Sequence, residues 1–153
     1  MPKLDLQAIA LRTGSGYPAP FHEVAQGRLR QALGDAGGLT QFGVNLLRLP
    51  PGAWSSQRHW HTAEDEFVTI LAGEVVLVTD EGETLLRVGD CAAFPAGIAN
   101  GHHLVNRSAG EAVCLEVGSR IPGDSAHYPD ADLYYDGSAD RYTHRDGTPY
   151  PSR

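Results

Sequence analysis

The 153-residue sequence contains only two cysteines, Cys91 and Cys114, too few for the disulfide framework of many small secreted domains. Each of them lies within an apolar, strand-like stretch. A reduced cysteine in such a stretch behaves as a small hydrophobic side chain. We therefore predict that both cysteines are reduced and buried.

Long apolar runs are also missing, since no segment approaches the roughly 20 residues that a membrane-spanning helix needs. The first residues, Met-Pro-Lys-Leu-Asp-Leu-Gln, lack the charged and then apolar pattern of a secretion signal. Together these two features predict a cytoplasmic protein with no membrane partner.

Positive charge is scarce as well. The chain has 12 Lys and Arg against 19 Asp and Glu, which gives a formal net charge of −7, and the basic residues form no patch. Nucleic acids and anionic membranes are both bound through such patches. The composition therefore argues against a nucleic-acid partner and favours a small-molecule substrate or ligand.

Glycine and proline, by contrast, are abundant, with 18 and 10 copies. This abundance fits short strands joined by tight turns better than a helical bundle. The length suits a single domain with its own core. About eight strand-like stretches recur at intervals of about ten residues, the spacing of an all-β sandwich or small barrel. They are residues 41–49, 54–61, 66–71, 74–79, 83–88, 91–94, 102–106 and 111–117.

The two ends of the chain differ from this strand-rich region. Residues 1–22 predict an extended arm that covers a sheet edge or a partner subunit. Residues 23–33 have weak helical spacing, which predicts a turn or two of helix. Residues 119–153 are polar yet rich in tyrosine, unlike a disordered tail, so we expect one or two edge strands there. The arm also suits a symmetric homodimer, the commonest oligomer.

The residues best suited to chemistry lie between Gly52 and Gly73, where His59 and His61 precede Glu66. On a β-strand the two histidines share one face, and a short turn can bring Glu66 beside them on the next strand. Two imidazoles and a carboxylate arranged in this way suit Zn, Fe, Mn or Ni. The alternative is a set of polar residues on a surface hairpin, and a metal site explains the pattern better.

A second cluster, residues 89–106, completes a resemblance to the cupin superfamily. The first cupin motif is Gly, then His-x-His, three or four residues, Glu, six residues and Gly. Residues 52–73 match it with one extra residue after the opening Gly. The second motif is Gly, five residues, Pro-x-Gly, two residues, His, three residues and Asn. Residues 89–106 match it with two inserted residues.

This insertion leaves three candidates for the histidine of the second motif. Strict spacing from Gly97 points to Asn100, whereas counting back from Asn106 points to His102. We favour His102 because the following strand fixes the register and a glycine-containing loop absorbs two residues easily. His103 then faces the other way, although a bulge in the loop would exchange the two histidines.

The resemblance implies a double-stranded β-helix, or jelly roll, over residues 38–120. An N-terminal arm with a short helix (1–37) and a C-terminal extension (121–153) would pack on this barrel. The resemblance also implies one divalent transition metal ion. Its ligands would be His59, His61, Glu66 and His102. Within the superfamily the chain resembles short bacterial single-cupin proteins, which have no assigned activity or a provisional sugar-phosphate-isomerase assignment.

A metal held by these four side chains keeps one or two positions open for water or substrate. The sequence therefore predicts a metal-dependent enzyme of isomerase or oxygenase type, acting on a small polar or carbonyl compound such as a sugar derivative. The alternative is a non-catalytic cupin that binds a small ligand as a sensor or storage module. A sensor usually carries a DNA-binding helix-turn-helix, and no such motif is visible in the sequence.

An isomerase also needs a base near the substrate carbon. Glu64 and Asp65 are close to the motif, but as turn residues we expect them to be solvated. The tail offers further candidates if it folds over the barrel mouth, and otherwise it covers a sheet edge. These candidates are His127, Tyr134, Tyr135 and Tyr142.

A phosphate-bearing substrate would need an arginine or lysine in the site. The strand candidates are Arg48, Arg58 and Arg87. Arg58 directly precedes His59, so alternation should point it away from the metal. This weakens the case for a phosphorylated sugar.

Overall fold

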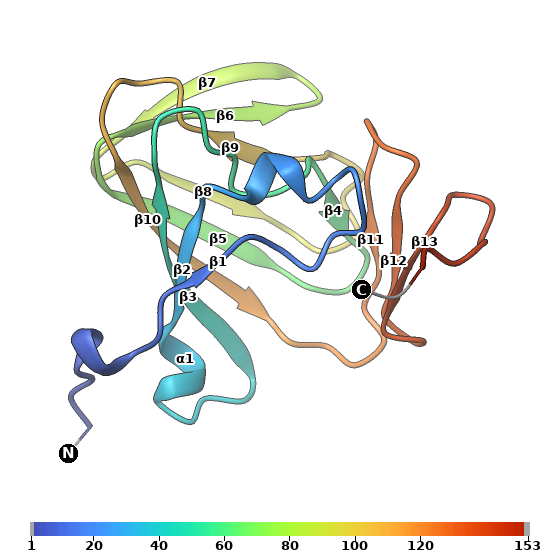
Figure 1. The fold of residues 1–153 in the computed structure, drawn as a ribbon, viewed down its shortest axis with the longest axis horizontal. Helices are drawn as coiled ribbons and strands as arrows, with labels where there is room; N and C mark the ends of the chain where they lie inside the picture. Colours follow the sequence, from blue (N-terminus) through green and yellow to red (C-terminus); the bar gives the residue numbers. More distant parts are fainter. Residues whose placement is uncertain (1, 152–153) are drawn as a thin grey trace.

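The computed structural model describes residues 2–151, which form antiparallel sheets with very little helix, so the predicted all-β class is confirmed (Figure 1). Residues 1, 152 and 153, which belong to the predicted N-terminal arm and C-terminal extension, lie outside the described residues. No helix within residues 2–151 is long and apolar enough to cross a membrane.

The largest sheet has six strands in the order β1-β2-β3-β10-β5-β8. These strands are β1 (Arg12–Thr13), β2 (Leu29–Ala32), β3 (Phe42–Leu49), β10 (Ala112–Ser119), β5 (Glu66–Ala72) and β8 (Cys91–Phe94). The long central pair of β3 and β10 is in continuous register from Leu49 opposite Ala112 to Phe42 opposite Ser119.

Two smaller sheets complete the molecule. The three-stranded sheet has the order β7-β6-β9, with β7 (Gly82–Arg87), β6 (Glu74–Thr79) and β9 (His103–Val105). The four-stranded sheet has the order β13-β12-β11-β4, with β13 (Arg141–Thr143), β12 (Tyr134–Asp136), β11 (Ala126–His127) and β4 (Trp60–His61). In Figure 1 this tail sheet stands at the right-hand side of the barrel.

The hydrophobic core lies between the six-stranded and three-stranded sheets. Alternate residues of each strand point inward, as the period of a half-buried strand requires. The buried core residues of the large sheet are Leu47, Leu49, Val68, Ile70, Ala112 and Cys114, and those of the small sheet are Val75, Leu86 and Leu104. The two sheets thus close into the expected jelly-roll barrel.

Gly73 joins β5 to β6, and only glycine fits there. Its φ is +69°, and a Cβ atom at this position would lie 2.5 Å from the carbonyl oxygen of Glu111. A side chain would therefore meet both backbone strain and a direct clash. This explains the closing glycine of the first histidine-containing motif.

The predicted helix over residues 23–33 is largely wrong. A 3₁₀ turn, η2 (Glu23–Ala25), is followed by strand β2 and then by a single helical turn, α1 (Leu33–Ala36). Strand β2 pairs with β3, with Arg30 opposite Leu47. Its ladder of backbone hydrogen bonds outweighs a helical spacing that was only weakly apolar.

The N-terminal arm covers the edge of the large sheet in its own chain. Strand β1 pairs with β2, and a further 3₁₀ turn, η1 (Leu6–Ala8), precedes it. The buried Gln31 side chain of β2 donates to the carbonyl oxygens of Leu6 at 2.7 Å and Ile9 at 2.9 Å. The arm therefore satisfies polar groups that an open edge strand would expose.

The C-terminal extension is more structured than the one or two predicted edge strands. It contributes β11, β12 and β13, and β11 pairs with β4, the strand that carries His61. A second buried cluster holds the extension against the arm: Tyr17, Ala126, Tyr128, Ala131 and Leu133. The tyrosines of the tail thus build a small core of their own, which the sequence could not place.

The other corrections concern one strand and one cysteine. The predicted strand 54–61 is regular only at β4, with single bridges from Trp54 to Val105 and from His59 to His102. Cys114 is buried, but Cys91 is exposed, because β8 is an edge strand and Cys91 points away from the core. Apolar neighbours in sequence did not distinguish an edge strand from a central one.

The fully buried Asn106 side chain ties together the end of β3 and the loop after β9. Its Nδ2 donates to the carbonyl oxygens of Leu49 at 2.7 Å and Gly110 at 2.8 Å. Its Oδ1 accepts from the backbone N–H and the hydroxyl of Ser108. Every hydrogen-bonding group of the buried amide is thereby engaged.

We predict that Asn106→Ala destabilises the fold by about 3 kcal/mol, because it leaves buried carbonyl groups without donors. In a thermal melt the midpoint should fall by roughly 5–10 °C. Arg107→Ala is the neighbouring control: it removes an exposed pair with Glu83, which contributes less than about 1 kcal/mol. Equal midpoints for the two variants would contradict this role of Asn106.

Candidate functional site

His59 and His61 reach the interior of the barrel from the segment that ends in β4. The backbones of His59 and His102 exchange two hydrogen bonds, at 3.2 Å and 2.9 Å. This bridge brings together two segments that are far apart in sequence. It also places the imidazoles of His59 and His102 side by side, with ring centroids 4.8 Å apart.

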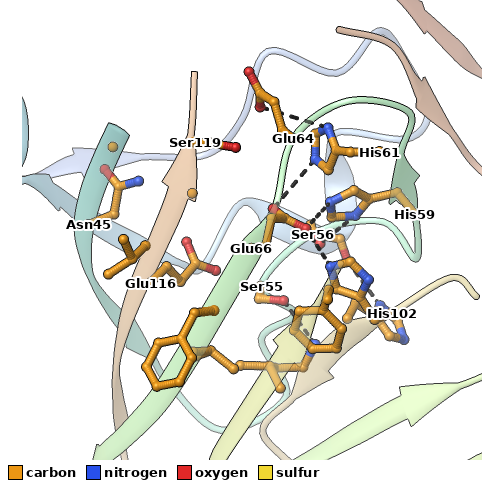
Figure 2. Close-up of a pocket in the computed structure, with 18 of the residues that line it drawn as sticks. Asn45, Ser55, Ser56, His59, His61, Glu64, Glu66, His102, Glu116 and Ser119 are labelled. Atoms are coloured by element: carbon orange, nitrogen blue, oxygen red, sulfur yellow. Dashed lines mark hydrogen bonds and ion pairs between the residues drawn. The ribbon is translucent and has the colours of Figure 1, made fainter. Parts of the chain in front are cut away.

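Glu66, the first residue of β5, lies at the centre of the histidines, and Figure 2 shows three imidazoles directed at its carboxylate. Its Oε2 is 2.5 Å from the Nε2 of His102 and 3.5 Å from the Nε2 of His59. Its Oε1 is 3.4 Å from the Nε2 of His61. The structure therefore brings together all four side chains that the sequence analysis selected as ligands.

Hydrogen bonds on the far side of the rings fix the tautomers of two histidines. The Nδ1 of His59 lies 2.8 Å from the carbonyl oxygen of Gln57, and the Nδ1 of His61 lies 2.6 Å from Oδ2 of Asp124. Both partners are acceptors, so each Nδ1 carries a proton, and each Nε2, once deprotonated, can present a lone pair to the centre of the cluster.

Asp124 is buried in the loop between β10 and β11, and sequence reasoning missed it. Besides His61, it accepts from the backbone N–H groups of Ala63 at 2.8 Å and Glu64 at 3.2 Å. It is 63 residues from His61 and lies in a polar stretch with no motif around it. No local signal in the sequence distinguishes it from the other acidic residues of the tail.

His102 and His103 have different surroundings. The ring of His102 stacks on Phe94, with centroids 3.6 Å apart, and its Nε2 meets Glu66. His103 instead contacts the carbonyl oxygen of Ser56 through Nδ1 at 2.9 Å, and packs edge-on against Trp54. Of the two, it is His102 that faces the other candidate ligands.

The donor set fits a divalent transition metal ion. The candidate ligand atoms of His59, His61 and Glu66 all lie within 4.8 Å of one another, and Nε2 of His102 reaches the same carboxylate. In their deprotonated forms these atoms are all electron-pair donors, which repel one another unless a proton or a cation lies between them. Nitrogen and oxygen ligands of this kind accept Zn, Fe, Mn or Ni.

The electrostatics of the four side chains show the same demand for positive charge. Burial raises the pKa of Glu66, but hydrogen bonds from His102, His59 and His61 outweigh it and hold that pKa well below the usual value. Burial alone would lower the pKa of His61, yet Glu66 and Asp124 raise it to about 9. Burial lowers the pKa of His102. A proton on His61 thus offsets the negative charge of Glu66 and Asp124.

The predicted solvation of the turn residues holds for only one of them. Asp65 is exposed, and its Oδ1 accepts from the backbone N–H of Ala96 at 2.8 Å. Glu64 is half-buried, accepts from Ile121 N–H at 2.9 Å and comes within 3.9 Å of His61 Nδ1. Its burial raises the pKa of Glu64.

A cavity of about 290 Å³ opens on one side of the cluster, against the inner face of β2, β3, β10 and β5. Besides the cluster, its polar lining residues include Arg30, Asn45, Ser55, Glu116 and Arg120. Figure 2 shows Glu116 and Asn45 on the wall across from the histidines. A second cavity, of about 330 Å³, meets the cluster from the side of Trp60, Leu77 and Phe94. Both are of a size that suits a small ligand.

Glu116 and Arg30 were not among the sequence candidates. Glu116 lies on the inward face of β10, two residues after the core residue Cys114, and burial together with the charge of Glu66 raises its pKa to about 7. A carboxylate two residues from a core residue on the same strand points to the same face, and this spacing predicts an interior polar group. Arg30 lies within residues 23–33, whose spacing predicts a helix, so the sequence did not place it on a strand of the barrel.

The basic and tail candidates lie away from both cavities. Arg58 forms a two-bond pair with Asp130, at 2.7 Å and 2.8 Å, and also contacts Asp80. Arg48 pairs with Glu111, and Arg87 is exposed beside Glu74. In the tail, His127 stacks on Trp60, while Tyr135 and Tyr142 pack against each other. None of those candidates lines either cavity.

Comparison with known proteins identifies the fold family. The family described as "Cupin domain" matches residues 45–118. No curated protein matches the chain. Among solved structures, a sugar phosphate isomerase of the cupin superfamily from Silicibacter pomeroyi is 50% identical, with a TM-score of 0.92, and the match covers 98% of this chain and 97% of that one.

Two further structures are more distant. A protein from Acidithiobacillus ferrooxidans with a provisional sugar phosphate isomerase name is 27% identical, with a TM-score of 0.79, over 99% of this chain and 97% of that one. The polyketide cyclase RemF from Streptomyces resistomycificus shares the fold alone, at 18% identity and a TM-score of 0.62 over 78% and 79% of the two chains. The fold, the paired motifs and the 50% identity lead to one assignment: this chain belongs to the cupin superfamily.

Proposed function

We propose that the protein is a metal-dependent isomerase acting on a small carbonyl compound of the sugar-phosphate class. The observation that carries this proposal is the convergence of three imidazole nitrogens and one carboxylate on a single point in the wall of a cavity. The proposed ligands are His59, His61, Glu66 and His102. The 50% identical relative from Silicibacter pomeroyi, named a sugar phosphate isomerase, supports the substrate class.

The chemistry divides between the metal and the cavity wall. A bound divalent metal would polarise the carbonyl or enediol oxygen of a substrate. Aldose–ketose isomerisation also needs a group that takes a proton from one carbon and returns it to the next. Glu116 meets this need, since its carboxylate faces the cavity and its pKa of about 7 lets it hold or release a proton near neutral pH. Asn45 and Ser55 line the same wall and can hydrogen-bond substrate hydroxyls.

We also propose that the chain forms a homodimer through the outer face of the large sheet. Most side chains of β3, β10 and β5 that point away from the core are apolar, with Arg48 and Thr69 among the exceptions, and Phe67 and Leu71 are 41% and 48% exposed. A contiguous apolar face of this kind is uncommon on a monomer. The free thiols of Cys91 and Cys114 favour a reducing compartment, and we propose the cytoplasm.

We predict that protein purified without added metal or an affinity tag contains near one equivalent of metal per chain, measured by inductively coupled plasma mass spectrometry. The double variant His59→Ala/His61→Ala should lose it, whereas the tail variant His144→Ala should keep it. Zinc or nickel would support an isomerase, and iron or manganese would favour an oxygenase instead. A parent protein that neither contains nor takes up metal would refute the catalytic proposal and favour a ligand-binding barrel.

The Asp124→Asn variant tests whether the hydrogen bond at the Nδ1 of His61 orients this ring to bind a metal through Nε2. The amide keeps the size of the side chain but loses the charge that holds the Nδ1 proton, so affinity for zinc should fall roughly 10–100-fold. Competition with a chromophoric chelator measures this affinity. Asp130→Asn, which alters the pair with Arg58, should leave zinc affinity unchanged. Equal zinc affinity in Asp124→Asn and the parent would contradict the positioning role.

The proposed dimer is tested by Leu71→Glu, which places a charge on the outer apolar face. Light scattering coupled to size-exclusion chromatography should give twice the mass of one chain for the parent and a single chain for the variant. Leu85→Glu is the matched control, because Leu85 is 40% exposed on β7 of the other sheet. A monomeric parent would exclude the dimer.

A further inference from the structure

The cavity beside the histidine cluster has a second polar region, at Arg30. This residue lies on β2 with its partner Leu47 in the core, which places the Arg30 side chain on the inward face of the sheet. It is half-buried and lines the same cavity as Glu66 and Glu116. A charged residue at such a position must either pair with a carboxylate or bind something in the cavity.

No partner for Arg30 is found among residues 2–151, where its guanidinium makes no hydrogen bond and no ion pair. Two other arginines of this region already have partners. Arg120, which also lines the cavity, pairs with Asp35 on α1. Arg28 donates to the carbonyl oxygens of Gly14 and Ser55. The five N–H donors of Arg30 are therefore available to a molecule in the cavity.

Two further arginines, Arg28 and Arg12, act on Arg30 in a chain whose net charge is −7. Burial lowers the pKa of Arg30, and so do the charges of Arg28 and Arg12, while Glu116 and Asp35 partly offset them. An anion entering this region would relieve both the repulsion among the arginines and the unmet donors of Arg30.

We propose that Arg30 binds an oxyanion of the substrate, a phosphate or a carboxylate, while the carbonyl end of the substrate faces the histidine cluster. This inference rests on the proposed function and deepens it, since it makes the substrate a small anionic compound held at two points. A guanidinium recognises such oxyanions through paired N–H donors. The modest volume of the cavity, about 290 Å³, restricts the compound to a small one.

Glu116 bears directly on this arrangement, because a carboxylate beside a bound anion would oppose binding. No ion pair joins Glu116 to Arg30, so it does not occupy the guanidinium. The raised pKa of Glu116 leaves much of it neutral near pH 7, and the neutral acid can donate a hydrogen bond to an oxyanion. The position of Arg58 weakens the case for a phosphorylated sugar as substrate. The position of Arg30 in the cavity supports that substrate class.

Isothermal titration of inorganic phosphate tests the proposal, with acetate and an unphosphorylated sugar, ribose, in parallel. Each probe is titrated into chelator-treated protein and into zinc-loaded protein, since phosphate can also bind a metal directly. We expect phosphate to bind both forms, and Arg30→Gln to weaken binding at least tenfold in both. Arg48→Gln, on the outer face and paired with Glu111, should bind like the parent.

The outcomes separate this proposal from the metal-dependent function. Tighter binding of phosphate than acetate would identify a phosphoester substrate, and the reverse a carboxylate. Phosphate bound by zinc-loaded protein alone, with no effect of Arg30→Gln, would overturn the role of Arg30 and leave the metal site standing. Should Arg30→Gln fail to give a cooperative melt, Glu116→Gln decides: removal of its charge should preserve or strengthen phosphate binding, and a loss of binding would refute the proposal.

Discussion

The hydrogen bond between His61 and Asp124 is the interaction on which the arrangement of the site depends. At 2.6 Å it joins the middle of the chain to the start of the C-terminal extension. Asp124 also receives the N–H groups of Ala63 and Glu64, so one carboxylate sets the turn that leads from the histidines to Glu66. The extension is thus a component of the site, although it contributes no ligand itself.

The tail sheet reinforces this connection from outside. β11 continues the sheet of β4 directly beyond the histidines, and Arg58 clamps Asp130 on the opposite face of the same segment. Since alternation sends His59 inward and Arg58 outward, one extended segment serves both the cavity and the packing of the tail. A tail that packs less tightly would therefore displace the candidate ligands, because the short strand β4 connects the two.

Much of the fold and part of the site could be predicted from the sequence, for physical reasons that differ between residues. His59 and His61 alternate with Trp60 in the extended segment that ends in β4, and Glu66 opens the next strand, β5, so local spacing was enough to predict their convergence. Asn106 fixed the register that favoured His102 over His103, and the structure places His102 beside Glu66. These inferences used contacts close in sequence or constrained by a repeating backbone geometry.

The features that the sequence did not predict depend on contacts between distant segments. Arg30 lies on a strand whose weak helical spacing predicts a helix, and only its pairing with β3 places it in the barrel wall. Asp124 acquires its role only through a partner 63 residues away. Glu116 could be predicted in part. Its position within β10 marks it as an interior residue, but its neighbours across the cavity cannot be inferred from the sequence. Composition likewise could not tell the edge strand of Cys91 from the central strand of Cys114.

The contrast between the two cysteines has a practical consequence. Cys114 is enclosed in the core, where burial and the nearby charge of Glu116 raise its pKa to about 12, whereas Cys91 is exposed. Thiol reagents attack the thiolate, so the two positions differ in both access and reactivity. The single chain therefore offers one addressable thiol, to which a fluorophore or spin label can be attached on the outer face of β8, beside the proposed dimer face, without any substitution in the barrel.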